Sequence, residues 1–369
     1  MTAFHRAVRC SNVPVLEYFI GLGEDVNSVS GDYPWTSLHH CCRSGNVATA
    51  KSLLAHGADI EKLVPADSKS TIHKAVKDNN IPLIELLLMK NPELLEEKDK
   101  DGYTPLHLSL LVPTQDAALT FLLQRGADIS ARIPNGETAL MVAAWKNHKD
   151  GALKLIERSK ALSDGKCPII FEKGTKGWTS LHYAARWNTD TYIIKLLLSN
   201  DAEVNAVEEN EVTPLGYAAE QGRLEAIRVL IAAGANIDAK DQWGRTAIMR
   251  AIKAKHVQAG QLLIELGASV LEKSYQYSMS ALIFAVTWTD SVPLVEALLK
   301  AGAAIDDLDN EECNPLTRAA VNGNRTIFEF LLAQGGKPDV IDILGQQPLQ
   351  RAARISSEKG VRILLDAKA

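Results

Sequence analysis

The sequence has few cysteines, a small net charge and no long apolar run. No stretch reaches the ~18–20 apolar residues that cross a bilayer, so we expect no membrane span. The first nine residues lack the uninterrupted apolar core of a secretory signal. Five cysteines, an odd number without framework spacing, indicate free thiols in a reducing compartment, and we expect a cytoplasmic or nuclear protein. A net charge of −5 argues against a surface that attracts nucleic acid as a whole.

Catalytic signatures are missing as well. The sequence contains no Gly-x-Ser-x-Gly, no phosphate-binding Gly-x-x-x-x-Gly-Lys-Ser/Thr, no zinc-binding His-Glu-x-x-His and no dinucleotide-binding Gly-x-Gly-x-x-Gly. No segment outside the repeat described below is long enough to hold a catalytic domain. We therefore expect no enzyme activity, no cofactor, no metal and no small-molecule substrate.

What the sequence has instead is an internal repeat. One apolar position recurs every 33 or 34 residues, with a single longer step of 41 between Leu140 and Leu181. The pattern defines eleven units that cover the whole chain, so it predicts one repeat domain over residues 1–369 with one insertion near 159–174. The recurring positions are Phe4, Leu38, Ile72, Leu106, Leu140, Leu181, Leu215, Ile248, Leu282, Leu316 and Leu349.

Each unit begins and ends with a short motif. The clearest start is Thr104-Pro105-Leu106-His107, and many units end in a Gly-Ala turn such as Gly234-Ala235. With this period, the two motifs resemble the ankyrin repeat. The resemblance implies an all-α fold in which each unit is a β-turn or hairpin tip followed by two antiparallel helices. Stacked units would form a curved solenoid with a concave groove.

The residues at the helix ends and in the helix contacts agree with this two-helix interpretation of each unit. Thr at the start of a unit is a good N-cap, and Pro after it stands where a helix loses no hydrogen bond. Small residues three and four positions after the recurring apolar residue would let neighbouring helices approach closely. Gly after the second helix can adopt the left-handed conformation. The predicted N-caps are Thr36, Thr104, Thr138, Thr179, Thr213 and Thr246, and the predicted C-terminal glycines are Gly23, Gly57, Gly126, Gly234, Gly267, Gly302 and Gly335.

Unit 1 starts directly at its first helix, without an upstream turn. We therefore expect either a longer natural chain before Met1, which would make this N-terminus a truncation, or an end that stays partly exposed.

Three residue patterns have both a functional and a structural interpretation. His39-His40-Cys41-Cys42 looks like a metal cluster, but four consecutive helical side chains point about 100° apart and cannot converge on one ion. The recurring histidine of the first helix serves, in the family, to bond turn to helix; it is His5, His39, His73, His107 and His182. Asn27 and Asn205 resemble the hairpin asparagine that oxygenases hydroxylate in some ankyrin proteins, and the same motif is a common turn ending.

A partner would bind where stacking leaves the helices free. The second, fifth and sixth positions after the recurring apolar residue lie opposite the core, and in the family this face lines the concave groove. Its second and fifth positions hold eleven basic residues and one acidic residue, Glu220, although acids outnumber bases in the whole chain. The basic residues are Arg6, Arg9, Arg43, Lys74, Lys77, Arg186, Arg250, Lys253, Arg318, Arg351 and Arg354, with His40 beside them.

Aromatic residues gather on the same face. Near its middle lie Trp145, Tyr183, Trp187 and Tyr217, and further on lie Phe284 and Trp288. A second group lies in the turn tips and either packs on neighbouring tips or contacts a partner: Trp35, Tyr103, Trp178 and Trp243. Exposed Trp, Tyr and Arg anchor many interfaces. We predict these partner-binding residues: Arg6, Arg9, His40, Arg43, Lys74, Lys77, Trp145, Tyr183, Arg186, Trp187, Tyr217, Arg250, Arg318 and Arg351.

The sequence thus predicts a monomeric, non-catalytic scaffold that binds a protein segment carrying acidic residues around an apolar centre. Basic units 1–3 and 10–11 would steer the segment, and the aromatic residues would anchor it. Two alternatives stay open. The chain could be a regulatory or targeting part of a larger protein, such as an inhibitor, a ubiquitin-ligase adaptor or a membrane scaffold. A nucleic-acid-associated factor could use the same basic groove, against which the net charge argues.

Overall fold

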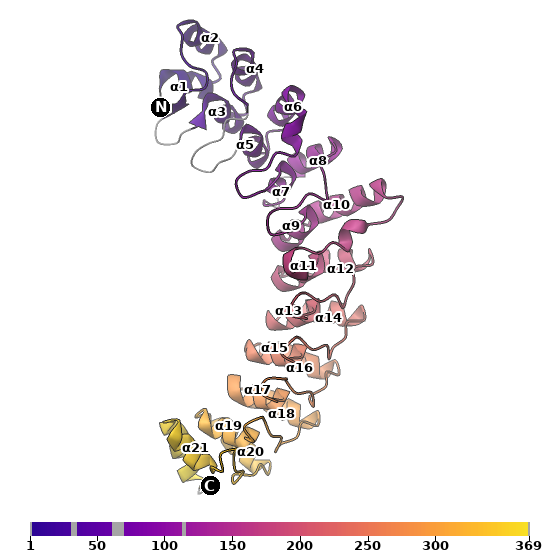
Figure 1. The fold of residues 1–369 in the computed structure, drawn as a ribbon, viewed down its shortest axis with the longest axis vertical. Helices are drawn as coiled ribbons and strands as arrows, with labels where there is room; N and C mark the ends of the chain where they lie inside the picture. Colours follow the sequence, from indigo (N-terminus) through magenta and orange to yellow (C-terminus); the bar gives the residue numbers. More distant parts are fainter. Residues whose placement is uncertain (1, 31–34, 61–69, 113–115, 368–369) are drawn as a thin grey trace. The chain divides into compact units, whose positions relative to one another are not determined.

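The computed structural model describes residues 2–30, 35–60, 70–112 and 116–367. In these ranges the chain forms eleven pairs of α-helices, one for each predicted unit (Figure 1). The first helix of each pair begins next to the predicted start motif. The first helices are α1 (Ala3–Arg9), α3 (Ser37–Ser44), α5 (Thr71–Lys77), α7 (Pro105–Ser109), α9 (Ala139–Lys146), α11 (Ser180–Trp187), α13 (Pro214–Glu220), α15 (Ala247–Lys253), α17 (Ala281–Trp288), α19 (Pro315–Val321) and α21 (Pro348–Arg354).

The second helix of each pair follows after a short turn. The second helices are α2 (Val13–Gly21), α4 (Val47–Ala55), α6 (Ile81–Lys90), α8 (Asp116–Gln124), α10 (Lys149–Leu162), α12 (Tyr192–Leu198), α14 (Leu224–Ala232), α16 (Val257–Glu265), α18 (Val292–Lys300), α20 (Arg325–Ala333) and α22 (Glu358–Asp366). None of the helices in the described ranges combines the length and hydropathy that crossing a bilayer requires.

Smaller elements lie between the pairs. Strands β1 (Val29–Ser30) and β2 (Trp35–Thr36) pair antiparallel, with Val29 opposite Thr36. The 3₁₀ turns are η1 (Pro92–Leu95), η2 (Pro168–Ile170) and η3 (Thr175–Gly177). The predicted insertion lengthens α10 and adds η2. Arg132 fastens it to the preceding hairpin by donating to the carbonyl of Lys173 at 2.8 Å and pairing with Glu172.

The chain divides into two compact units, Met1–Thr175 and Lys176–Ala369, which are described separately. In each unit the first helices pack on one another in one row and the second helices in another, and the two helices of a repeat pack together. The core lies between the rows. Helices α1 to α10 form the first unit and α11 to α22 the second. The prediction that residues 1–369 form a single domain stays a prediction.

The predicted N-caps start their helices. Thr36, Thr104 and Thr179 each accept the backbone N–H of the histidine three residues later, and Thr213 accepts that of Gly216 at 3.2 Å. The other two, Thr138 and Thr246, have the extended conformation of a cap, but their hydroxyls accept no such bond. The paired small residues lie in the core: Ala143, Ala144, Ala184, Ala185, Ala218, Ala219, Ala319 and Ala320 are fully buried.

The glycine after the second helix is required by backbone conformation. Gly234 has a φ of +89°, and the other six predicted glycines have φ between +84° and +96°. A Cβ atom at Gly234 would meet no heavy atom within 4 Å, so sterics with the rest of the fold do not select glycine there. The left-handed conformation selects it, because L-residues other than Asn and Asp adopt it at a cost.

Side-chain bonds to the backbone join consecutive repeats. His182 contacts Thr179 Oγ1 through Nδ1 at 2.9 Å and the carbonyl oxygen of Val212, in the next hairpin, through Nε2 at 3.0 Å. His5 and His73 make the same link to the carbonyls of Ser28 and Glu97. The recurring histidine therefore bonds turn to helix, as the family resemblance implies. Burial lowers the pKa of His107 to about 4, so it is neutral at neutral pH.

The two hairpin asparagines also join repeats. Asn27 donates to the carbonyl of Gly57 at 3.1 Å and accepts the N–H of Asp59 at 2.6 Å. Asn205 donates to the carbonyl of Gly234 at 3.2 Å and accepts the N–H of Asn236 at 2.7 Å. These contacts give both side chains a structural role, in agreement with the turn-ending interpretation of the motif.

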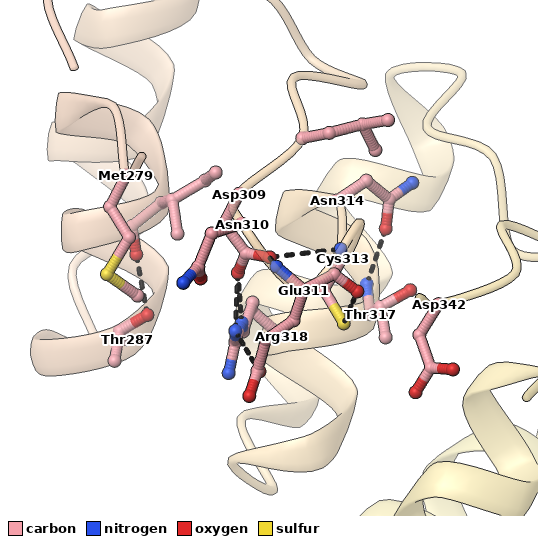
Figure 2. A network of polar contacts seen from close by, with 12 residues as sticks. Met279, Thr287, Asp309, Asn310, Glu311, Cys313, Asn314, Thr317, Arg318 and Asp342 are labelled. Atoms are coloured by element: carbon pink, nitrogen blue, oxygen red, sulfur yellow. Dashed lines mark hydrogen bonds and ion pairs between the residues drawn. The ribbon is translucent and has the colours of Figure 1, made fainter. Parts of the chain in front are cut away.

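Buried hairpin carboxylates organise the second unit. One oxygen of Asp241 accepts the backbone N–H groups of Trp243 and Arg245, and its other oxygen pairs with Arg250, nine residues on, at 2.8 Å. Two later repeats have the same arrangement at the same spacing, Asp309 with Arg318 at 2.5 Å and Asp342 with Arg351 at 2.9 Å. Figure 2 shows the carboxylates of Asp309 and Glu311 turned toward the guanidinium of Arg318. The carboxylate thus fixes the hairpin and anchors it to the first helix.

The left-handed conformation of Gly234 predicts the effect of a substitution there. Gly234→Ala should lower the free energy of unfolding by about 1 kcal/mol, because alanine is strained at positive φ. Gly234→Asn should lower it less, because asparagine tolerates this conformation. Urea titration followed by circular dichroism measures both changes. If alanine were tolerated better than asparagine, the conformational explanation would be wrong.

The hairpin carboxylates predict an acid-sensitive contribution to stability. Burial raises the pKa of Asp342, but the backbone N–H of Gln346 and the guanidinium of Arg351 outweigh it, so the net shift is downward. A lowered folded pKa means stability that is present above the unfolded value of ~4 and lost as the pH falls through the folded pKa. Asp342→Asn should therefore lower the free energy of unfolding by roughly 2–3 kcal/mol at neutral pH, since it leaves the buried Arg351 with one partner fewer.

The difference between wild type and Asp342→Asn should stay constant above about pH 5 and shrink below about pH 4. Urea titrations across this range measure it. The matched control is Asp339→Asn, which changes an exposed carboxylate of the same hairpin and should alter stability by less than ~0.5 kcal/mol. A difference that grows on acidification would contradict the assignment.

Candidate partner-binding surface

Four aromatic rings of the second unit form one group with Trp178 at its centre. The centroid of its ring lies 4.5 Å from that of Tyr217, 5.1 Å from Tyr183 and 5.4 Å from Trp187. Tyr183 and Trp187 stand one turn apart on α11 and stack at 5.4 Å, while Trp178 comes from the hairpin before α11. The structure therefore brings together three of the four predicted aromatic anchors.

Arg186 completes this group. Its guanidinium lies over the rings of Tyr217, Trp187 and Trp178, at 4.9, 5.2 and 5.8 Å from their centroids. Such cation–π contacts hold a charged group against aromatic faces, and the Arg186 side chain stays partly exposed. The carboxylate of Glu220 lies 4.0 Å from Arg186. The predicted contact residue Arg186 is thus held in place by its own repeat and the next.

Two hollows continue from the aromatic group along the first-helix row. The first has a volume of about 330 Å³ and is lined by side chains that include Arg186, Tyr217, Glu220, Arg250 and Ala254. The second has a volume of about 350 Å³ and is lined by side chains that include Ser274, Gln276, Tyr277, Phe284 and Trp288. Trp243, Arg245 and Lys253 line both hollows.

Because the hollows share a wall, the side chains around them form one strip across repeats 6 to 9. We call it the aromatic–basic surface. It consists of Trp178, Tyr183, Arg186, Trp187, Tyr217, Trp243, Arg245, Lys253, Tyr277, Phe284 and Trp288.

Tyr217 differs from the prediction of an exposed anchor. Its side chain is 5% exposed, whereas Trp187 is 40% exposed. Burial, and after it the negative charge of Glu208, raises the pKa of Tyr217 to about 12, so the phenol stays protonated. Tyr217 is therefore the buried ring of the group, Trp178 and Tyr183 are partly exposed, and Trp187 is the most exposed.

Three predicted basic contacts are also corrected. Arg250 and Arg351 are 7% and 5% exposed, and together with Arg318 they are held by carboxylates. Arg250 also pairs with Glu220, and Arg318 and Arg351 share Glu311. The charge count over helix positions omitted the hairpin acids, which neutralise these arginines. The positive bias of repeats 8, 10 and 11 is therefore smaller than the sequence indicated.

The remaining predicted residues lie in the first unit. Arg6, Arg9 and Lys77 are exposed, and Trp145 is 36% exposed with the ammonium of Lys146 3.7 Å from its ring centroid. Two further predicted residues make contacts within the fold. Lys74 pairs with Asp78 at 2.9 Å, and its ammonium lies 4.9 Å from the centroid of the Trp35 ring. The ring of His40 lies 5.4 Å from that of Trp35. The side chain of Arg43 lies outside the described residues. A single binding strip along all eleven repeats stays a prediction.

The sequence prediction omitted several residues of the surface. The sequence indicates turn tips for Trp178 and Trp243 without deciding between packing and binding, and it indicates a charge but no contact for Lys253. Arg245 and Tyr277 were not singled out. Trp243 and Tyr277 both stand five residues before the recurring apolar position, at Ile248 and Leu282. Comparing this hairpin position between repeats would have revealed them.

Two clusters of potential metal ligands have other roles. Cys41 and Cys42 are buried, burial raises the pKa of Cys41 to about 12, and His39 contacts Thr36 through Nδ1 at 2.6 Å. These contacts assign the His39–Cys42 run a packing role, as the helical spacing predicts. The second cluster is Asp309, Glu311 and Cys313, with ligand atoms within 4.8 Å of one another.

The second cluster is already occupied by protein groups. The guanidinium of Arg318 lies between the two carboxylates, 2.5 Å from each (Figure 2). Burial raises the pKa of Cys313 to about 11, which keeps the thiol protonated at neutral pH. A protonated thiol is a poor ligand, because metals bind the thiolate. The chemistry of this cluster is therefore that of an ion-pair network.

Comparison with known proteins agrees with the architecture. The family model for ankyrin repeats (3 copies) matches overlapping segments that together run from residue 1 to residue 369. A putative ankyrin repeat protein of Fowlpox virus (strain NVSL) is 33% identical over 145 residues, which are 39% of this chain and 33% of that protein. The B-cell lymphoma 3 protein homolog of Mus musculus is 26% identical over 257 residues, 65% of this chain and 54% of that protein.

A third relative is transient receptor potential cation channel subfamily A member 1 of Homo sapiens. It is 24% identical over 266 residues, 69% of this chain and 23% of that protein. The chain thus spans between about a quarter and about half of the length of these relatives. Since the matched repeats cover the whole sequence and the helix pairs follow them one by one, the chain belongs to the ankyrin-repeat family.

Proposed function

We propose that the chain is a non-catalytic scaffold that binds a segment of a partner protein on the aromatic–basic surface. Ankyrin repeats imply protein–protein interaction. The observation that supports this location is the exposure of two tryptophans: Trp187, 40% exposed, in the aromatic group, and Trp243, 37% exposed, in the wall shared by hollows of about 330 and 350 Å³. Tryptophan, tyrosine and arginine contribute most of the binding energy at many interfaces.

The charges around the first hollow support an acidic partner segment. Arg186, Arg250, Arg245 and Lys253 line it, against the carboxylate of Glu220 in the lining and that of the buried Asp241 behind Arg245 and Arg250. This excess of positive charge complements acidic side chains, which would speed association and fix the register of the segment. The aromatic walls complement an apolar centre.

The thiols support a reducing compartment such as the cytosol or the nucleus. All five cysteines are free: Cys10 is exposed, and Cys41, Cys42, Cys167 and Cys313 are buried. Disulfides are rare where glutathione and thioredoxin keep thiols reduced. We therefore propose that the chain acts in the cytosol or the nucleus.

The surface predicts a loss of binding when its exposed tryptophans are removed. Replacing Trp187 and Trp243 together by alanine should raise the Kd of the partner by at least ~30-fold, about 2 kcal/mol, because both rings anchor the segment. Partners are captured from an extract of the source cells with the immobilised chain and identified. The Kd of each is then measured by isothermal titration calorimetry with the purified partner.

The matched control is Tyr192→Ala. Tyr192 is 42% exposed and begins α12, the second helix of repeat 6. This variant should change the Kd by less than about twofold, since second helices are not part of the aromatic–basic surface. A purified partner that binds the double variant as tightly as the wild type would exclude the aromatic–basic surface as its site.

A further inference from the structure

Lys253 is a cation without a counter-ion on the aromatic–basic surface. It ends α15, is exposed and lines both hollows. Among the described residues no carboxylate lies within 4.0 Å of its ammonium group. Each of the three arginines that line the first hollow, by contrast, lies within that distance of a carboxylate.

The arginines of the first hollow are bound by the fold. Arg245 pairs with Asp241 at 2.9 Å, and Arg250 pairs with Asp241 and Glu220. Two carboxylates therefore serve three guanidinium groups, counting Arg186 at 4.0 Å from Glu220. Lys253 adds a fourth positive charge to this group. An incoming anion would meet an uncompensated positive potential, and Lys253 is the group free to move toward it.

The titration of Lys253 reflects the same surroundings. Partial burial lowers its pKa, and the positive charges of Arg245 and Arg250 lower it further, while Asp241 and Glu220 act in the opposite direction. A bound carboxylate would relieve this repulsion. The attraction is stronger than for a lysine in open solvent because aromatic side chains displace water on one side.

The second hollow supplies an apolar site next to Lys253. Phe284 is buried beside Trp288, with ring centroids 4.6 Å apart, and Trp243 and Tyr277 are exposed at its rim. In an extended segment, alternate side chains point to the same face about 7 Å apart. A residue that contacts Lys253 can therefore have a neighbour two positions away in the second hollow.

We propose that Lys253 binds the carboxylate of an aspartate or glutamate of the partner segment, and that the second hollow takes an aromatic or large aliphatic side chain two positions away. This recognition rests on the proposed function, because it assumes that a protein segment occupies the aromatic–basic surface. It adds the chemical identity of the contact and the residue that makes it. The charge complementarity and the shared wall of the two hollows support it.

Selection of random peptides displayed on phage tests the proposal. The library is selected on the wild-type chain, and each enriched peptide is synthesised with a fluorescent label for anisotropy measurements. Enriched peptides should carry an acidic residue two positions from an aromatic or large aliphatic residue. Lys253→Glu should weaken their binding at least about tenfold, which is ~1.4 kcal/mol, and Lys253→Met should weaken it less, because it removes the charge without reversing it.

The control is Lys195→Glu, which makes the same charge change at an exposed lysine on α12. It should alter the affinity by less than about twofold. Circular dichroism of each variant checks that it folds. Trp288→Ala tests the second hollow separately and should weaken binding about tenfold or more without loss of the acidic preference, because the ring forms its wall.

The outcomes separate the two proposals. Peptides that lose binding in the Trp187 and Trp243 double variant but carry no acidic residue, or bind Lys253→Glu unchanged, overturn the role of Lys253 and leave the proposed function standing. Peptides that bind every surface variant unchanged overturn both. A further measurement uses a selected peptide in which phosphoserine replaces the acidic residue. Tighter binding of the phosphopeptide by about tenfold or more would assign the contact to a phosphate and overturn the carboxylate.

The last measurement is the binding of a labelled single-stranded oligonucleotide to the wild-type chain and to Lys253→Glu. If it bound the wild-type chain more tightly than the selected peptides and lost affinity in Lys253→Glu, the surface would be a nucleic-acid site and the proposal would fail. Strong weakening by salt would accompany that result.

Discussion

The structure depends on the contact between one repeat and the next. A single helix pair is too small to bury its apolar face, and the fully buried alanines of the first helices lie where neighbouring first helices meet. Polar contacts run in parallel with this packing. His182 and Asn205 each bond the backbone of the following repeat, and buried carboxylates such as Asp241 hold several hairpin tips in one conformation. Within each unit the repeats are therefore both packed and hydrogen-bonded to one another.

The fold was predictable because its signals repeat. A period of 33 or 34 residues, a threonine cap and a left-handed glycine each recur, so a weak signal in one unit is supported by the others. The eleven helix pairs follow from this regularity. The binding surface was less predictable, because helix geometry indicates which positions leave the core but not which charges meet. Asp241 and Asp342 lie nine residues before the arginines they neutralise, in hairpins that the helical count did not include.

The same geometry separates structural cations from those available to a partner. Arg250 and Arg351 belong to the fold, since each is buried and held by two carboxylates. Lys253 stands one turn beyond Arg250 on the same helix and faces the hollows. Residues of one type on one helix face thus have different roles, and the hairpin sequence decides which role each one has. Composition of the face alone could not separate them.

The histidine links between repeats end on main-chain atoms. His5, His73 and His182 contact the carbonyl oxygens of Ser28, Glu97 and Val212, three residues with nothing in common as side chains. Every residue offers the same carbonyl group, so the acceptor survives almost any mutation at its own position. Substitutions in the hairpin tips, and duplication or exchange of whole repeats, can therefore leave these histidine–carbonyl hydrogen bonds intact. In such hairpins the main-chain carbonyl joins the repeats, and the side chains at the tip remain available for contact with a partner.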